Sequence, residues 1–211
     1  MNRIRQSIQR EEFDYGALTL ALREYRRPRD KISSLLSSKQ ILRVKKGLYI
    51  FGPDWSRRPA SKEVLANLIH GPSYVSLDYA LAFYGLIPER VSEITSVTSR
   101  SSKVFKTFLG TFSYKHLSLA RYSVGLRLEQ YSEGEFFLIA SREKALADKL
   151  ALSGAITKQA DLTALEQLLV EDLRINIEEL RSFDKRHMYE VARVYRSKNV
   201  DLLLEFIVGV V

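Results

Sequence analysis

The sequence predicts an α+β protein of two domains, a small unit of helices and one hairpin at residues 1–58 and a larger mixed domain at 59–211. Apolar residues recur at helical spacing within the first forty residues, and two short β-rich runs follow them. Further along, a group of strand-like runs gives way to a helical C-terminal part. We expect the larger domain to contain an antiparallel-rich sheet.

The first domain begins with two segments whose apolar residues are spaced for helices. Ile4 and Ile8 are four positions apart, which suits a short first helix. Leu18 and Leu22 belong to a single apolar stripe within residues 15–25, which predicts a second helix.

A third helix is predicted over residues 28–38, after a basic pair at 26–27. Pro28 suits the first helical turn because the N–H that proline lacks has no partner there. Ile32 and Leu35 point inward at helical spacing. The outward face is short and polar and consists of Arg29 at its margin, Asp30, Lys31, Ser33, Ser34, Ser37 and Ser38.

A β-hairpin is predicted next, from runs at 41–44 and 48–51. The turn between them contains Lys45, Lys46 and Gly47, so we expect two lysines at the tip. Two helices joined by a turn and followed by a hairpin are typical of a winged helix-turn-helix.

The larger domain is predicted to start with two helices, to continue with strands and to end in helices. The expected helices and strands, with their capping residues, are 62–69 (Ser61), 77–84 (Ser76), strands 93–98, 104–109, 111–117, 125–131 and 135–140, and helices 142–152 (Ser141), 159–171, 177–182 (Asn176), 185–197 (Asp184) and 200–208 (Asn199).

The excess of positive charge is confined to the first third of the chain. Residues 1–62 contain fifteen lysines and arginines against six acids, a net charge of +9, whereas the other 149 residues have a net charge of −1. A charge that serves only solubility has no reason to be segregated, whereas a module that binds a polyanion does.

These observations predict that the first domain binds double-stranded DNA. The third helix is expected to enter the major groove, and the basic turn and hairpin are expected to contact phosphates. The predicted contact residues are Arg26, Arg27, Arg29, Lys31, Ser33, Ser34, Ser37, Lys39, Arg43, Lys45 and Lys46. The alternative is a three-helix cap with a hairpin whose lysines are merely solvated.

The sequence offers no pattern for a metal, a cofactor or catalysis. Cysteine is absent, and His70, His116 and His187 do not have metal-ligand spacing. No glycine-rich phosphate loop occurs. We therefore expect no cofactor, no catalytic or metal residues and no membrane span, since the apolar end at 202–211 is too short for one.

In several stretches the chain resembles the AbiEi antitoxins of bacterial abortive-infection, type IV toxin–antitoxin systems. The resemblance covers about residues 10–155. The stretches that carry it are Leu42–Tyr49, Tyr74–Leu81 with Tyr84–Ile87, Ile94–Thr98 with Phe105–Thr107, Gly110–Tyr114, and Ile139–Asp148.

The resemblance implies a cytoplasmic bacterial protein with an N-terminal winged helix-turn-helix. Such a protein represses its own promoter by binding repeated sequences there. It also counteracts a nucleotidyltransferase toxin, without a stable complex between the two proteins. The basic N-terminal residues would contact DNA, and the second domain would carry the antitoxin activity.

Two alternatives remain open. The first is a stand-alone winged-helix regulator without a toxin partner. The second is a nucleic-acid-processing enzyme that uses Glu143, Lys144 and Asp148, since an acid with a lysine is found in some metal-dependent nucleases. For these three residues we favour a structural role in a helix that Ser141 caps.

Overall fold

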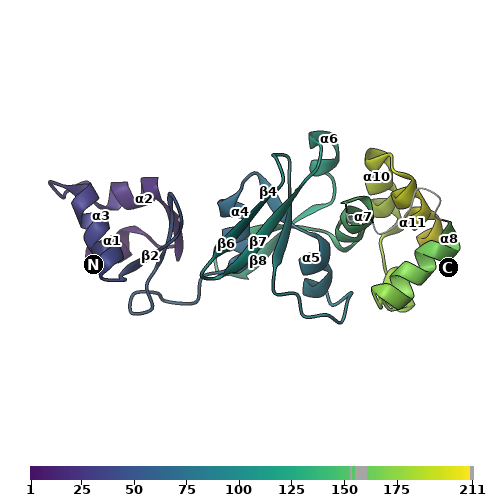
Figure 1. Cartoon of the computed structure of the whole chain (residues 1–211), viewed down its shortest axis with the longest axis horizontal. Coiled ribbons are helices and arrows are strands. Elements are labelled where there is room, and N and C mark those ends of the chain that lie inside the picture. The colour runs from purple at the N-terminus through teal and green to yellow at the C-terminus, as the bar shows by residue number, and fades with distance from the viewer. Residues whose placement is uncertain (153, 155–160, 210–211) are drawn as a thin grey trace.

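The computed structural model describes residues 1–152, 154 and 161–209. An N-terminal unit, a central sheet and a helical C-terminal part follow one another along the long axis, so that the first helices and the last ones lie at opposite ends (Figure 1). The predicted α+β class and helical C-terminal part are confirmed.

The N-terminal unit contains three helices and a three-stranded antiparallel sheet with the strand order β1-β3-β2. Its elements are α1 (Asn2–Ser7), β1 (Glu12–Asp14), α2 (Tyr15–Ala21), α3 (Pro28–Ser37), β2 (Ile41–Lys45) and β3 (Leu48–Phe51). Strand β1 was not predicted, because three residues are too few to show an alternating pattern.

Helix α2 is shorter than the sequence predicts. It begins at Tyr15, and the carboxylate of the preceding Asp14 accepts the N–H of Ala17 at 2.7 Å as its N-cap. It ends at Ala21 rather than near residue 25, because the chain turns there and the N–H of Tyr25 bonds the carbonyl of Leu22 at 2.9 Å.

Strand β3 is buried along its whole length, because both of its faces pack against other elements. Tyr49 and Phe51 face a small core formed with the three helices. Leu48 and Ile50, with Val44 of β2, belong instead to the larger core of the second domain. The two halves of the chain are therefore joined by apolar packing through β3.

Polar contacts reinforce this junction. The carboxylate of Glu12 accepts the N–H of Ser61 at 2.6 Å. The guanidinium of Arg58 forms an ion pair with Glu135 and lies 5.2 Å from the ring centroid of Tyr131. The segment 57–60 is thus held on both sides, since the N–H of Arg57 also donates to the carboxylate of Glu11 in the N-terminal unit at 3.1 Å.

The second domain is built on a six-stranded sheet with the strand order β6-β7-β5-β4-β9-β8. Its first elements are α4 (Lys62–Ile69), β4 (Ser73–Val75), α5 (Leu77–Phe83), β5 (Ile94–Thr98), β6 (Lys103–Thr107), β7 (Gly110–His116), α6 (Leu119–Tyr122), β8 (Leu126–Ser132) and β9 (Glu135–Ala140). The sheet is mixed: β5–β7 and β4–β9 are parallel pairs, and the other neighbours are antiparallel. The three-residue strand β4 was not predicted.

Helices form the rest of the described chain: α7 (Arg142–Leu152), α8 (Leu162–Gln167), the π-helical turn η1 (Leu168–Asp172), α9 (Ile177–Arg181), α10 (Lys185–Tyr195) and α11 (Lys198–Gly209). Of the helix predicted over 159–171, residues 159–160 lie outside the described part. The caps predicted at Ser61, Asn176 and Asp184 are confirmed. Asn199 lies inside α11 instead, and Ser76 forms no capping hydrogen bond.

The carboxyl group of Glu12 lies in a buried position that disfavours its charged form. The residue is 3% exposed, and its Oε2 atom has no hydrogen-bond partner among the described residues. Burial raises the pKa of the Glu12 carboxyl above its ordinary value, against the lowering effect of the Ser61 N–H. A raised folded-state pKa gives stability at low pH that is lost as the pH rises through that pKa.

We predict that Glu12→Gln raises the melting temperature at neutral pH, because glutamine keeps an acceptor for Ser61 without the buried charge. The gain should be about 1 kcal/mol and should vanish at pH values below about 4, where the wild-type carboxyl is protonated in both states. Thermal unfolding of both proteins across this pH range measures it. Glu24→Gln, at an exposed position, is the control, and a destabilised Glu12→Gln at neutral pH would contradict the prediction.

Candidate nucleic-acid interface

Helix α3 presents the predicted basic and hydroxyl side chains to solvent. Arg26 and Arg27 lie in the segment before the helix and are exposed, as is Arg29 in its first turn. Lys31 is half-buried, and its ammonium lies 5.7 Å from the ring centroid of Tyr25. Ser33, Ser34, Ser37 and, after the helix, Lys39 are all exposed.

Three serine hydroxyls of α3 and its C-cap donate hydrogen bonds to carbonyls of the same helix. Ser33 donates to the carbonyl of Arg29 at 3.2 Å, and Ser37 donates to the carbonyl of Ser33 at 2.9 Å. Ser38 donates to the carbonyl of Ser34 at 2.8 Å. The oxygen lone pairs of Ser33, Ser37 and Ser38 therefore remain available to accept, and a rotation of the hydroxyl would be needed to donate to a phosphate.

A hollow of about 550 Å³ opens beside the N-terminus of α3. Tyr15 and Thr19 of α2 line one side, and Arg27, Arg29 and Asp30 line the other. Unpaired N–H groups at a helix N-terminus attract anions, and the two guanidinium groups add positive charge. The exposed carboxylate of Asp30, 3.9 Å from Arg27, reduces that charge in part.

The hairpin separates two lysines that the sequence places together. Arg43 and Lys46 are exposed, and Lys46 occupies the turn with Gly47, whose φ of 85° favours glycine. Lys45 is not at the tip. It is the last residue of β2, and its ammonium donates to the carbonyl of Ile69 in the second domain.

Lys45 meets a second group of basic residues that the sequence analysis missed. The ammonium groups of Lys45 and Lys103 lie 5.9 and 5.1 Å from the ring centroid of Phe105. Burial lowers the pKa of Lys45, and repulsion from Lys103 and Arg100 lowers it further. Positive charge therefore continues from the hairpin onto the start of β6. We call Arg100 and Lys103 the sheet basic pair.

A signal for this pair was present in the sequence. Residues 94–128 contain six lysines and arginines and no acid. The net charge of the whole second part conceals this run, because many acids lie further along the chain. A sliding count of charge would have revealed it, although only the structure places it beside the hairpin.

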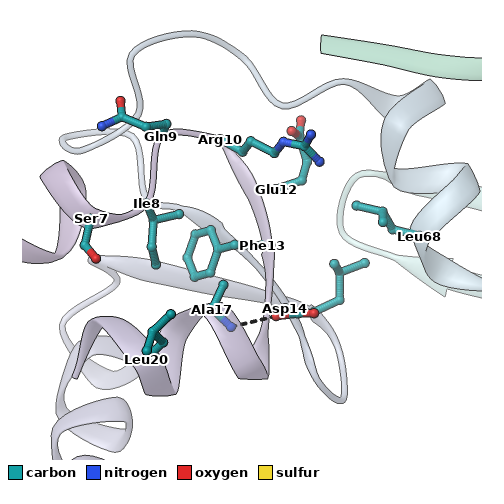
Figure 2. Close-up of a pocket in the computed structure, with 11 residues that line it drawn as sticks. Ser7, Ile8, Gln9, Arg10, Glu12, Phe13, Asp14, Ala17, Leu20 and Leu68 are labelled. Atoms are coloured by element: carbon teal, nitrogen blue, oxygen red, sulfur yellow. Dashed lines mark hydrogen bonds between the residues drawn. The ribbon is translucent and has the colours of Figure 1, made fainter. Parts of the chain in front are cut away.

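A pocket of about 330 Å³ opens along the free edge of β1 (Figure 2). Ile8, Phe13 and Leu20 of the N-terminal unit line it, and Leu68 reaches it from α4. The carboxylate side chain of Glu12 also lines it. Arg10 also lines the pocket (Figure 2), but apolar walls and a buried acid do not suit a phosphate, so we do not include this pocket in the interface.

The acid and lysine side chains that the enzyme alternative requires lie in the interior. Lys144 and Asp148 of α7 have no exposed surface and form an ion pair at 3.2 Å. Asp148 also accepts hydrogen bonds from Tyr74 at 3.0 Å, from Ser76 at 2.7 Å and from Tyr195. This cluster joins α7 to β4, to the start of α5 and to α10.

The cluster satisfies the polar atoms that it buries. The ammonium of Lys144 also donates to the carbonyl of Arg121 at 2.8 Å and lies 4.4 Å from the ring centroid of Tyr195. Burial lowers the pKa of Lys144 against the opposing effect of Asp148, and it raises the pKa of both tyrosines that bond the carboxylate. A buried pair with complete hydrogen bonding supports a structural role. Glu143 is likewise buried and accepts the N–H of Asp184 at 3.1 Å.

Ser141, His187 and Glu190 are connected in the serine–histidine–acid order of a hydrolase triad. Ser141 Oγ lies 3.0 Å from Nε2 of His187, whose Nδ1 lies 3.7 Å from a carboxylate oxygen of Glu190. However, Ser141 has no exposed surface, and its oxygen accepts the N–H of Lys144 at 3.2 Å as the cap of α7. Gly125 lies against this contact, since its carbonyl accepts the N–H of Ser141 at 2.7 Å and a side chain there would collide with Lys144. The serine therefore acts as a cap.

Within the described residues, no three His, Asp or Glu side chains are grouped as a metal ion would require. None of the described helices has the length and apolarity that crossing a bilayer demands. No protein-family model and no curated protein matches the chain.

Proposed function

We propose that the protein binds duplex DNA and that residues 1–58 act as a winged helix-turn-helix. In this proposal α3 lies in the major groove, and the turn between β2 and β3 contacts the flanking backbone. The observation that carries it is a basic surface in two parts, the exposed arginines and lysines of α3 and the hairpin and, beyond Lys45, the sheet basic pair.

In this proposal the charged side chains and the serines of the interface have different tasks. Charged side chains on the turn, the hairpin and β6 suit phosphates, which give affinity and register. The serines of α3 are short, so they would let the helix approach the base edges closely. Their free lone pairs suit the exocyclic amines of adenine and cytosine.

We further propose that the protein represses its own promoter by binding repeats there and that it is the antitoxin of a type IV toxin–antitoxin system. Its counterpart would be a nucleotidyltransferase toxin, without a stable complex between the two. This part rests on the resemblance to AbiEi antitoxins. In the proposal the protein acts by binding, with no cofactor and no chemistry of its own, in the bacterial cytoplasm.

We predict different effects for phosphate contacts and base contacts. Lys46→Ala should weaken binding to every duplex by about three- to ten-fold at low salt, because it removes one ionic contact. Ser34→Ala should change the ratio of affinities for the protein's own upstream DNA and a scrambled duplex. Mobility shifts with both duplexes measure these effects.

The control for this experiment is Arg193→Ala, which removes an exposed positive charge from α10, far from the proposed interface (Figure 1). It should leave both affinities nearly unchanged. If it weakened binding as much as Lys46→Ala, the attraction would be diffuse and the proposed interface would be wrong.

The antitoxin role makes a separate prediction. Co-expression with a nucleotidyltransferase toxin encoded beside this gene should restore the growth that the toxin stops. Lys46→Ala should protect as well as the wild type, because the resemblance assigns protection to the second domain. Failure of the wild-type protein to protect would favour a stand-alone regulator instead.

A further inference from the structure

Strand β8 ends the six-stranded sheet, and its outer edge pairs with no strand in the described part of the chain. Its pairing with β9 is regular from Leu126 to Gln130, and the register shifts only between Gln130 and Ser132. Because the N–H and C=O groups of successive residues point to opposite edges of a strand, about every second residue of this regular segment offers unpaired backbone groups to a partner, a situation that proteins usually avoid.

One face of this edge carries apolar side chains that nothing covers. Leu128 is 62% exposed, and its direct partner across the β8–β9 pair is Leu138, which is 36% exposed. Phe136 lies in the neighbouring position of β9 and is 47% exposed. These three residues form a contiguous patch that reaches the open edge.

The other face of the same edge carries two opposite charges. Arg127 and Glu129 flank Leu128, and alternation along a strand places both of them on the face away from it. Neither forms an ion pair with another described residue. The strand therefore presents one positive and one negative group at equal distances from Leu128.

We propose that β8 pairs with β8 of a second copy of this chain, antiparallel and about a twofold axis through Leu128. In this arrangement Arg127 of each copy lies directly opposite Glu129 of the other, which makes two cross-strand ion pairs. Leu128 lies beside its own symmetry mate, so the row Leu138, Leu128, Leu128, Leu138 continues across the seam.

Symmetry leaves few other registers. Directly opposite residues in a sheet point to the same face, so the axis must pass through a residue rather than between two. An axis through Arg127 sets two arginines opposite each other, and an axis through Glu129 sets two glutamates opposite each other. Both arrangements are unfavourable. An axis through Leu126 or Gln130 does not set Arg127 opposite Glu129, so it forms neither of these two ion pairs. The register through Leu128 matches charge and apolar surface together, and it does not depend on the proposed DNA binding.

The experiment is sedimentation of the full chain over a wide range of concentration without DNA. We expect a reversible dimer. Arg127→Glu, which sets glutamates opposite each other, should raise its dissociation constant by about ten-fold or more. Glu129→Arg, which sets arginines opposite each other, should do the same. Arg193→Glu makes the same charge change as Arg127→Glu at a distant exposed position and should have no effect.

Mixing the two variants separates pairing from misfolding. Arg127→Glu places glutamates at both positions and Glu129→Arg places arginines at both, so the mixture should form a heterodimer more tightly than either variant alone forms a homodimer. The double variant Arg127→Glu/Glu129→Arg should dimerise like the wild type. A wild-type chain that stays monomeric at every concentration, or a mixture that forms no heterodimer, would overturn the proposal.

Discussion

The burial of β3 on both faces is the constraint on which the rest of the arrangement depends. A four-residue strand that packs on helices with one face and on a second domain with the other cannot leave either neighbour without exposing apolar surface. The hairpin turn is fixed in the same way, and so is the position of the N-terminal helices relative to the large sheet. This packing therefore sets the positions of α3 and the hairpin turn in the proposed interface relative to β6.

The same packing brings positive charges together. Lys45 is drawn toward α4, where burial lowers its pKa and where Lys103 and Arg100 repel it. Such a concentration of like charge is unfavourable in the free protein, and a bound polyanion would relieve it. In the proposed complex, a phosphate backbone beside Lys45, Lys103 and Arg100 would reduce the repulsion between them.

Much of the fold could be predicted from the sequence, because its signals are local. The proline that opens α3, the glycine of the hairpin turn and the capping residues Ser61 and Asp184 act on neighbouring residues. Strands β1 and β4 were missed because three residues give no period. The parallel pairs were missed because they join distant segments.

The candidate site was predicted less completely, because the sequence does not show where a side chain points or which distant residues it contacts. The sequence identifies Lys45 as basic, but only tertiary packing decides that its side chain points toward Ile69. Likewise, the helical pattern of α7 gives no indication that Lys144 and Asp148 are buried, because their partners Tyr74 and Tyr195 lie far away in the chain. Summing charge over a long segment also concealed the sheet basic pair.

The most direct measurement is the salt dependence of duplex binding by the wild-type protein and by Lys103→Ala. If β6 and the hairpin contact one DNA together, the wild-type affinity falls steeply with salt, by about 0.9 logarithmic units per unit of log salt for each phosphate contacted. The slope for Lys103→Ala should then be shallower by about one. A nearly flat wild-type slope would contradict DNA binding, and identical steep slopes would show that Lys103 contacts no phosphate.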